Sequence, residues 1–354
     1  MIQADVLAAT ELTPDLRSRW LEIRNSAQIY NSPFLHPDFT TAAASVWDGI
    51  QVGVLREGTR VVGFFPFRRH RFGVARPVGG RLSDYQGIVV DLDTEWDAVD
   101  VISKCGLNHY CFDHMIEQAP FALHATIRDS SPVMSLSKGY EHYRSTGCKG
   151  RSNRLKGIER KQRKLAREQG PADFELASPD RQVLETVIQW KRSQCQKTGT
   201  TDYFGDPANR SLVKTLHAID TTEFGGMLSV LRVNGNVAAA HFGIRSSTTL
   251  HWWFPVYSHT LSAYTPGGIL LLELARQCPS MGCNIIDLGR GDDAYKSSFK
   301  DHDIPLLEGH VSASHMISNG LRIYESTAHL LYRGARKLKQ LRGKLFKSTR
   351  DKAS

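Results

Sequence analysis

Two stretches of the chain, separated by 176 residues, echo each other. VLREGTRVVGFFPFR begins at Val54, and VLRVNGNVAAAHFGIR begins at Val230. Each stretch contains a turn pair, Glu57–Gly58 in the first and Asn234–Gly235 in the second, and each therefore predicts a β-hairpin. The other interpretation of this similarity is a chance match between two hairpins built from common residues. In both halves, helices precede the hairpin, and a mixture of strands and helices follows it. This order favours two similar α/β domains in tandem.

The length of the chain agrees with two domains. Its 354 residues are too many for one ordinary hydrophobic core. Hydrophobic residues make up 41% of the chain and charged residues 23%, as in soluble globular proteins. We therefore expect an α/β (α+β) fold in which each domain is a mixed sheet flanked by helices. The expected segments are an N-terminal domain (1–140), a basic linker helix (141–171), a C-terminal domain with the candidate active site (172–320) and a basic amphipathic tail (321–354).

The net charge of +9 is concentrated in two segments. Residues 144–168 and residues 333–354 each carry a net charge of +8, so the rest of the chain carries −7. Clustered Lys and Arg can bind nucleic acid. However, aromatic residues are not interleaved with these cations and no base-reading motif accompanies them. These two absences argue against nucleic-acid binding as the main function, so this role is kept only as an alternative to an enzyme.

The tail has the pattern of a basic amphipathic helix. From Tyr324 to Phe346, leucines are interspersed with Arg and Lys. Such a helix could hold the chain reversibly at an anionic inner membrane, because each cation near acidic headgroups favours binding. A solvated tail that keeps the protein soluble is the other interpretation.

No targeting segment or metal site is visible in the sequence. The N-terminus, MIQADVLAATELTPD, has no basic start and no apolar run, and no stretch is apolar enough to span a membrane. The six cysteines are scattered, and no pair has CxxC spacing. We therefore expect a cytoplasmic protein with reduced thiols, no bound metal and no permanently bound cofactor.

The stretch from Thr249 to Phe299 contains the candidate active site. Leu250–Tyr257 is aromatic and uncharged, which predicts a buried strand. Thr265 is a predicted helix cap, followed by Pro266 in the first helical turn. A short apolar strand over Cys283–Leu288 then ends in the polar sequence GRGDDAYK. Charged residues at the end of an interior strand must meet solvent, a ligand or each other.

These features together carry a resemblance to a known family. PVGGRLSDY is followed in the chain by a basic linker helix, an NG hairpin, an aromatic strand, a TPGG turn, an LLL helix and a strand ending in IDLGRGDDAYK, in this order. The order resembles the GNAT-type acetyltransferase family named for cellulose biosynthesis. That family is similar to the Fem-type aminoacyltransferases of peptidoglycan, which have two GNAT folds in one chain. The resemblance covers roughly residues 15–310 and implies acyl transfer.

The resemblance assigns a donor site to the TPGG turn. In GNAT folds, the loop after the fourth strand offers backbone N–H groups and a helix dipole to the pyrophosphate of an acyl-CoA. Pro266, Gly267 and Gly268 stand at this loop, and glycine allows a ligand to approach the backbone closely. Arg290 and Lys296 are candidates for binding an anionic part of the donor. Acetyl-CoA is the expected co-substrate.

The donor loop departs from the usual GNAT pattern. That pattern is Arg or Gln, two residues, Gly, one residue, and Gly or Ala. Tyr264 stands at its first position and Ile269 at its last. Thr-Pro-Gly-Gly is also an ordinary start for a helix.

Six further residues are candidates for catalysis or for binding the acceptor. An attacking amine or hydroxyl must lose a proton, which a carboxylate, His or Tyr can take. The structural alternatives are a solvated turn with a capped helix, a core histidine and a β-turn. The candidate catalytic residues are Asp292, Tyr295 and His241, and the candidate acceptor-binding residues are Asp84, Tyr85 and Asp287.

The sequence thus favours an N- or O-acyltransferase. It would move an acyl group, acetyl by expectation, from acyl-CoA to an amine or hydroxyl in polysaccharide or cell-envelope biosynthesis. One alternative is a Fem-type aminoacyltransferase that uses charged tRNA, with the basic linker holding the RNA. The other is a non-catalytic module that binds nucleic acid or a protein partner.

Overall fold

The computed structural model describes residues 2–146, 149–291, 293 and 295–313. In these residues, one 13-stranded sheet has the order β1-β2-β3-β4-β6-β13-β7-β12-β11-β10-β9-β8, and β5 pairs with β3. The first half of the chain supplies β1 (Gln3–Ala8), α1 (Pro14–Asn25), α2 (Pro37–Ala44), β2 (Ile50–Glu57), β3 (Arg60–Arg69), β4 (Val74–Arg76), β5 (Val89–Val90), α3 (Ala98–Lys104), β6 (His109–Ile116), α4 (Ala119–Ala122) and β7 (Ala125–Ser135). The second half supplies α5 (Tyr140–Thr146), α6 (Lys149–Gln169), β8 (Ala172–Glu175), α7 (Arg181–Thr198), α8 (Pro207–His217), β9 (Phe224–Val233), β10 (Asn236–Ser246), β11 (Thr249–Tyr257), α9 (Pro266–Gln277), β12 (Ile285–Asp287), α10 (Lys296–Phe299) and β13 (His302–Ser312).

The two halves repeat the same order of elements. With β5 set aside, each half from β1 and from β8 runs strand, two helices, three strands, helix, strand, helix, strand. The hairpins with similar sequences, β2–β3 and β9–β10, occupy the same place in this order. The expected α/β fold with tandem halves is confirmed.

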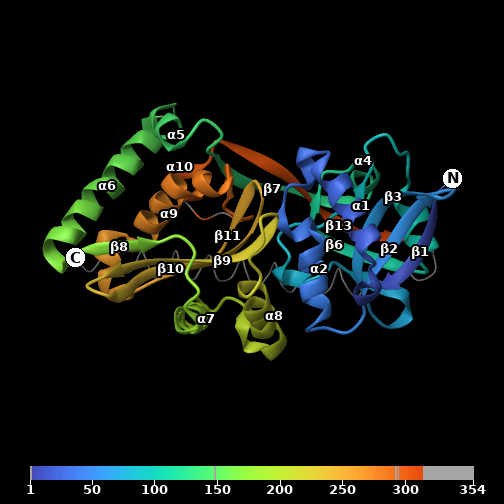
Figure 1. The fold of residues 1–354 in the computed structure, drawn as a ribbon, viewed down its shortest axis with the longest axis horizontal. Helices are drawn as coiled ribbons and strands as arrows, with labels where there is room; N and C mark the ends of the chain where they lie inside the picture. The colour runs from blue at the N-terminus through green and yellow to red at the C-terminus, as the bar shows by residue number, and fades with distance from the viewer. Residues whose placement is uncertain (1, 147–148, 292, 294, 314–354) are drawn as a thin grey trace, which may run out of the picture.

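The last strand of each half is exchanged with the other half. β13 lies between β6 and β7, with Leu306 opposite Ile116 and His302 opposite Val133. β7 in turn pairs with β12, where Asp287 lies opposite Val133. Figure 1 shows β13, at the red end of the colour range, crossing into the half of the molecule that holds the blue and cyan strands. The two separate sheets expected from the sequence are therefore one sheet, because each half completes the other.

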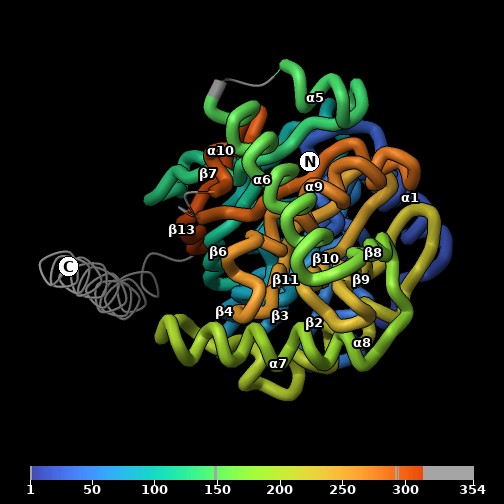
Figure 2. Tube along the Cα trace, turned by 90° about the vertical axis from the view of Figure 1, so that its left-hand side faces the viewer, coloured from blue at the N-terminus to red at the C-terminus, as the bar shows by residue number. Residues whose placement is uncertain are grey.

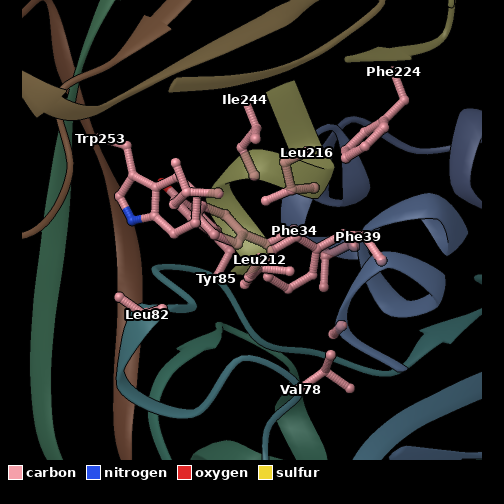
Figure 3. Close-up of a cluster of buried hydrophobic side chains, with 14 of the residues drawn as sticks. Phe34, Phe39, Val78, Leu82, Tyr85, Leu212, Leu216, Phe224, Ile244 and Trp253 are labelled. Carbon is pink, nitrogen blue, oxygen red and sulfur yellow. The ribbon is translucent and has the colours of Figure 1, made fainter. Parts of the chain in front are cut away.

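The hydrophobic core also spans both halves. One cluster combines Phe34 and Phe39 of the first half with Leu212, Leu216 and Ile244 of the second. Figure 3 shows these side chains pointing toward one another between the blue helices and the yellow-green α8. Apolar burial of this kind is the main favourable term in association, so this shared cluster helps to hold the two halves together.

The basic linker helix lies on the second half rather than between the halves. Leu155, Ile158 and Leu165 form its thin buried stripe. α6 packs along α9, where Gln162 Nε2 donates to Glu273 Oε1 at 2.6 Å. Figures 1 and 2 both show α6 beside α9. α6 covers most of the segment expected as the basic linker helix (141–171), and the short helix α5 precedes it.

The other segment expected from its charge pattern, the tail at 321–354, lies outside the described residues. The domain boundaries stay a prediction, although β13 falls within 172–320 and pairs with β6 and β7 of the first half. Within the described part of the chain, no helix has the length and apolar character needed to cross a membrane.

A glycine in β13 tests the exchange of strands. A Cβ on Gly309 would lie 2.3 Å from the backbone oxygen of His124, so Gly309→Ala must displace β13 from β7. We expect a loss of about 1–3 kcal/mol in the free energy of unfolding, measured by urea titration. Gly157→Ala in α6 is the control, because a Cβ there meets nothing within 4 Å and should stabilise the helix by about 0.5–1 kcal/mol. Wild-type stability of Gly309→Ala would contradict the described packing of β13.

Candidate active site

A parallel strand pair in the second half provides the framework of the site. β11 and β12 run parallel, with Thr249 opposite Ile285 and His251 opposite Asp287. β12 ends at Asp287, whereas β11 continues to Tyr257. The chain therefore runs from the carboxyl end of β11 to the start of α9, and from the carboxyl end of β12 into the GRGDDAYK turn. Ligands of open α/β sheets bind at such carboxyl ends.

Asp287 is a buried carboxylate bound by both halves of the chain. Tyr85 Oη donates to its Oδ2, and Ser131 Oγ donates to Oδ1 at 2.6 Å. Gly289 N, from the turn that follows β12, donates to Oδ1 at 2.8 Å. Burial alone would raise the pKa of Asp287, but the attraction of His251 and these hydrogen bonds lower it below its usual value. Asp287 is therefore ionised, and Tyr85, whose pKa is raised by burial and by this carboxylate, keeps its proton.

His251 lies between two carboxylates. Its Nε2 lies 2.8 Å from Asp84 Oδ2, and its Nδ1 lies 3.5 Å from Asp287 Oδ1, which is too long for a good hydrogen bond but close enough for charge attraction. The ring is fully buried and meets Phe34 edge to face. Burial lowers the pKa of His251, but the two carboxylates outweigh burial and raise it to about 9. At neutral pH His251 is therefore an imidazolium that donates to Asp84.

Asp84 is the member of this group that reaches solvent. Its side chain is 24% exposed, whereas those of His251 and Asp287 are 0% and 2% exposed. Oδ2 is bound to His251, and Oδ1 lies 3.9 Å from His114 Nε2. Burial lowers the pKa of His114, yet Asp113 and Asp84 raise it above its usual value. The structure thus brings together all three predicted acceptor-binding residues, Asp84, Tyr85 and Asp287, and adds His251, which the sequence did not indicate.

The cations of the GRGDDAYK turn are engaged within the protein. Arg290 Nε donates to Asp129 Oδ2 at 2.6 Å, and its Nη2 donates to Glu308 Oε2 at 3.0 Å. Lys296 Nζ is buried and donates to the backbone oxygen of Gly289 at 3.0 Å. These contacts fix the turn to β7 and β13, and they do not support the donor-binding role expected for Arg290 and Lys296.

The three predicted catalytic residues have different positions. Asp292 lies outside the described residues. Tyr295 is half-buried, and burial raises its pKa to about 12. His241 is fully buried and stacked on Trp252, and its Nε2 accepts a hydrogen bond from Trp253 N at 3.1 Å. Because burial lowers the pKa of His241 to about 3, it is a neutral core histidine and a poor base.

The start of α9 differs from the prediction in its cap. Thr265 has a left-handed backbone (φ 57°) and makes no side-chain cap. Instead its hydroxyl bonds Lys161 Nζ of α6 at 2.6 Å, so the sequence missed both the cap geometry and this lysine. Gly268 N donates to Thr265 O, whereas Gly267 N has no partner among the described residues. A Cβ on Gly267 would meet only Tyr257 at 3.6 Å, so space remains beside this N–H.

Metal binding has no evident place in the described residues. No group of three or more His, Cys, Asp or Glu residues there could hold a metal ion. The groups that the described residues bring to the site are carboxylates, an imidazolium, a tyrosine and the backbone N–H groups at the start of α9.

Comparisons with known proteins support the fold. Residues 152–297 match the sequence family described as an acetyltransferase (GNAT) domain. FemX superposes with a TM-score of 0.56 at 10% identity, covering 87% of this chain and 97% of its own. A tandem GNAT protein from the clavulanic acid biosynthesis pathway gives 0.51 at 10% identity, with coverages of 89% and 99%. The C-terminal domain of a putative lysylphosphatidylglycerol synthetase from Agrobacterium fabrum gives 0.52 at 11% identity, with coverages of 88% and 96%.

These similarities define the class of fold. The chain has a GNAT-type fold in tandem, and the matched acetyltransferase domain includes the second half with β11, α9 and β12. At 10–11% identity the solved structures speak only for the fold. The comparison with curated proteins found no match.

The raised pKa of His251 predicts how stability depends on pH. The pKa rises from 6.5 to about 9 on folding, so the folded state holds an extra proton between these values. The free energy of unfolding should then fall as pH rises through this window, by about 3 kcal/mol in all. The raised pKa of His114 adds to the fall. Urea unfolding at a series of pH values measures it, and His251→Gln should flatten the slope. Constant stability of the wild type across the window would show that His251 is not held as an imidazolium.

Proposed function

We propose that this protein is an acyltransferase that moves an acyl group, acetyl in the simplest case, from acyl-CoA to an amine or hydroxyl acceptor. The observation that supports this most is Asp84. It is a partly exposed carboxylate held by a buried imidazolium at the junction of two GNAT-type halves. A base in this position can take the proton that the acceptor must lose.

The reaction we propose needs two proton transfers. The acceptor nitrogen or oxygen attacks the thioester carbonyl and gives its proton to Asp84, whose Oδ2 is held by His251. The C–S bond then breaks and the thiolate of CoA takes a proton. Tyr295 stays protonated at neutral pH because its pKa is about 12, which suits donation to this thiolate better than the base role expected from the sequence.

The donor is assigned to the start of α9. Gly267 N and the positive end of the helix dipole can meet the pyrophosphate of acyl-CoA. The usual Arg or Gln of this loop is replaced by Tyr264, and Lys161 reaches the loop from α6. We propose that Lys161 supplies the positive charge that Tyr264 cannot.

The acceptor is proposed from the resemblance to the family named for cellulose biosynthesis. It would be an amine or hydroxyl of a polysaccharide or a cell-envelope precursor. A cytoplasmic location, with peripheral contact between the tail and an anionic inner membrane, belongs to this proposal.

A second candidate is aminoacyl transfer from charged tRNA, the reaction expected of a Fem-type enzyme. Two observations favour it: the similarity to FemX in fold, and the row of exposed cations on α6 beside the donor loop. The residues in that row are Arg154, Lys156, Arg160, Arg163, Lys164 and Arg167. A non-catalytic binding module is the remaining alternative.

The role of Asp84 can be tested by kinetics. Asp84→Asn keeps a side chain of the same size beside His251 but cannot accept a proton. We expect kcat for acetyl transfer to fall by about 10²–10⁴ with little change in KM for acetyl-CoA. Asp293→Asn is the matched control, since Asp293 is an exposed carboxylate 3.3 Å from Lys296 in the following turn, and it should act like the wild type. Equal kcat for Asp84→Asn and the wild type would exclude Asp84 as the base.

Thermal stability in the presence of ligand identifies the donor. Acetyl-CoA at 100 times its Kd should stabilise the wild type by about 2.7 kcal/mol and raise Tm by several degrees. Gly267→Val and Lys161→Ala should each reduce the shift, because the first blocks the free N–H and the second removes the cation. Binding of charged tRNA without any shift by acyl-CoA would favour the Fem-type candidate. Binding of neither would favour the non-catalytic module.

A further inference from the structure

The loop between β3 and β4 exposes an aromatic side chain in a strained conformation. The strands pair with Arg68 opposite Arg76, and His70 N closes the loop by donating to Val74 O at 2.7 Å. Phe72 stands at the tip with φ 59° and ψ 28°. Its side chain is 86% exposed, the largest value among the exposed apolar residues of the described chain.

Phe72 does not serve the stability of the fold. The left-handed region is unfavourable for a residue with a bulky side chain, and glycine or asparagine would occupy it more easily. Burial could compensate for such strain, but this ring buries little surface. Strained, exposed residues of this kind mark functional positions more often than structural ones.

The surroundings of Phe72 are cationic. The side chain of Arg71 is exposed and makes no hydrogen bond or ion pair within the described part of the chain. Arg76 is also exposed on the same short hairpin. His70 is exposed too, but partial burial and the nearby Arg68 and Arg76 lower its pKa, so it adds no positive charge at neutral pH. An apolar tip flanked by cations fits an anionic lipid surface, which takes the ring into the headgroup boundary and attracts the cations.

The described part of the chain ends close to this loop. Asn108 Nδ2 donates to the backbone oxygen of Phe72 at 3.0 Å, and Asn108 O accepts from Ala313 N at 3.0 Å. Ala313 is the last described residue. The 41 residues that follow it carry a net charge of +8 in the sequence.

We propose that the β3–β4 loop, residues 70–73, binds the surface of an anionic membrane. Phe72 enters the boundary between headgroups and acyl chains, and Arg71 contacts acidic headgroups. This contact belongs to the folded body and is separate from any contact that the tail makes. This proposal does not depend on acyl transfer.

Co-sedimentation of the full-length chain with vesicles tests the loop. Vesicles of phosphatidylcholine alone are compared with vesicles that also contain phosphatidylglycerol. At low salt we expect binding only to the mixed vesicles. Phe72→Asp and Arg71→Glu should each lower the ratio of bound to free protein about 10-fold. The control is Leu92→Asp, because Leu92 is 70% exposed but lies beyond the opposite end of β3, and it should bind as the wild type does.

A further variant separates binding from folding. Phe72→Gly removes the ring and suits a left-handed backbone, so it should keep or raise Tm while still weakening vesicle binding. The proposal fails if the wild type does not bind the mixed vesicles. It also fails if the Phe72 and Arg71 variants bind as tightly as the wild type, since binding would then be a property of the tail. Equal losses in Leu92→Asp would likewise overturn it.

Discussion

The carboxylate of Asp287 is the interaction on which the arrangement of this molecule depends. It is 2% exposed and receives hydrogen bonds from Tyr85 and Ser131 of the first half and from Gly289 of the second. A buried charge that loses its partners is strongly destabilising. The two halves must therefore meet in a single register, and the pairing of β7 with β12 brings Ser131 to this carboxylate.

The exchange of β7 and β13 explains why the candidate site belongs to neither half alone. Asp84 comes from the first half, whereas His251 and the donor loop come from the second. His251 links the buried Asp287 to the partly exposed Asp84, because an imidazolium between two carboxylates is attracted to both. A repeated fold can thus supply one combined site, with the first half contributing the proposed base, Asp84, rather than a second copy of the chemistry.

Much of the fold could be predicted from the sequence, because local signals determine it. The hairpin turns, the strand Leu250–Tyr257 and the helix that begins at Pro266 follow from residue patterns. The exchange of strands could not be predicted, because the residues of β13 suit pairing with a strand of either half. His251 was missed for a related reason. Its aromatic strand predicts burial, but its partners lie elsewhere in the chain: Asp287 is opposite it on β12, and Asp84 is in the first half. Lys161 could not be singled out from the other cations of its helix.

We propose that donor and acceptor meet between the start of α9 and Asp84. A crystal structure of the protein with a non-hydrolysable acetyl-CoA analogue would show whether they do. We expect the pyrophosphate against Gly267 N and Lys161, and the acyl carbonyl on the side of β11 and β12 where Asp84 reaches solvent. An analogue bound elsewhere, or with its acyl group remote from Asp84, would contradict it.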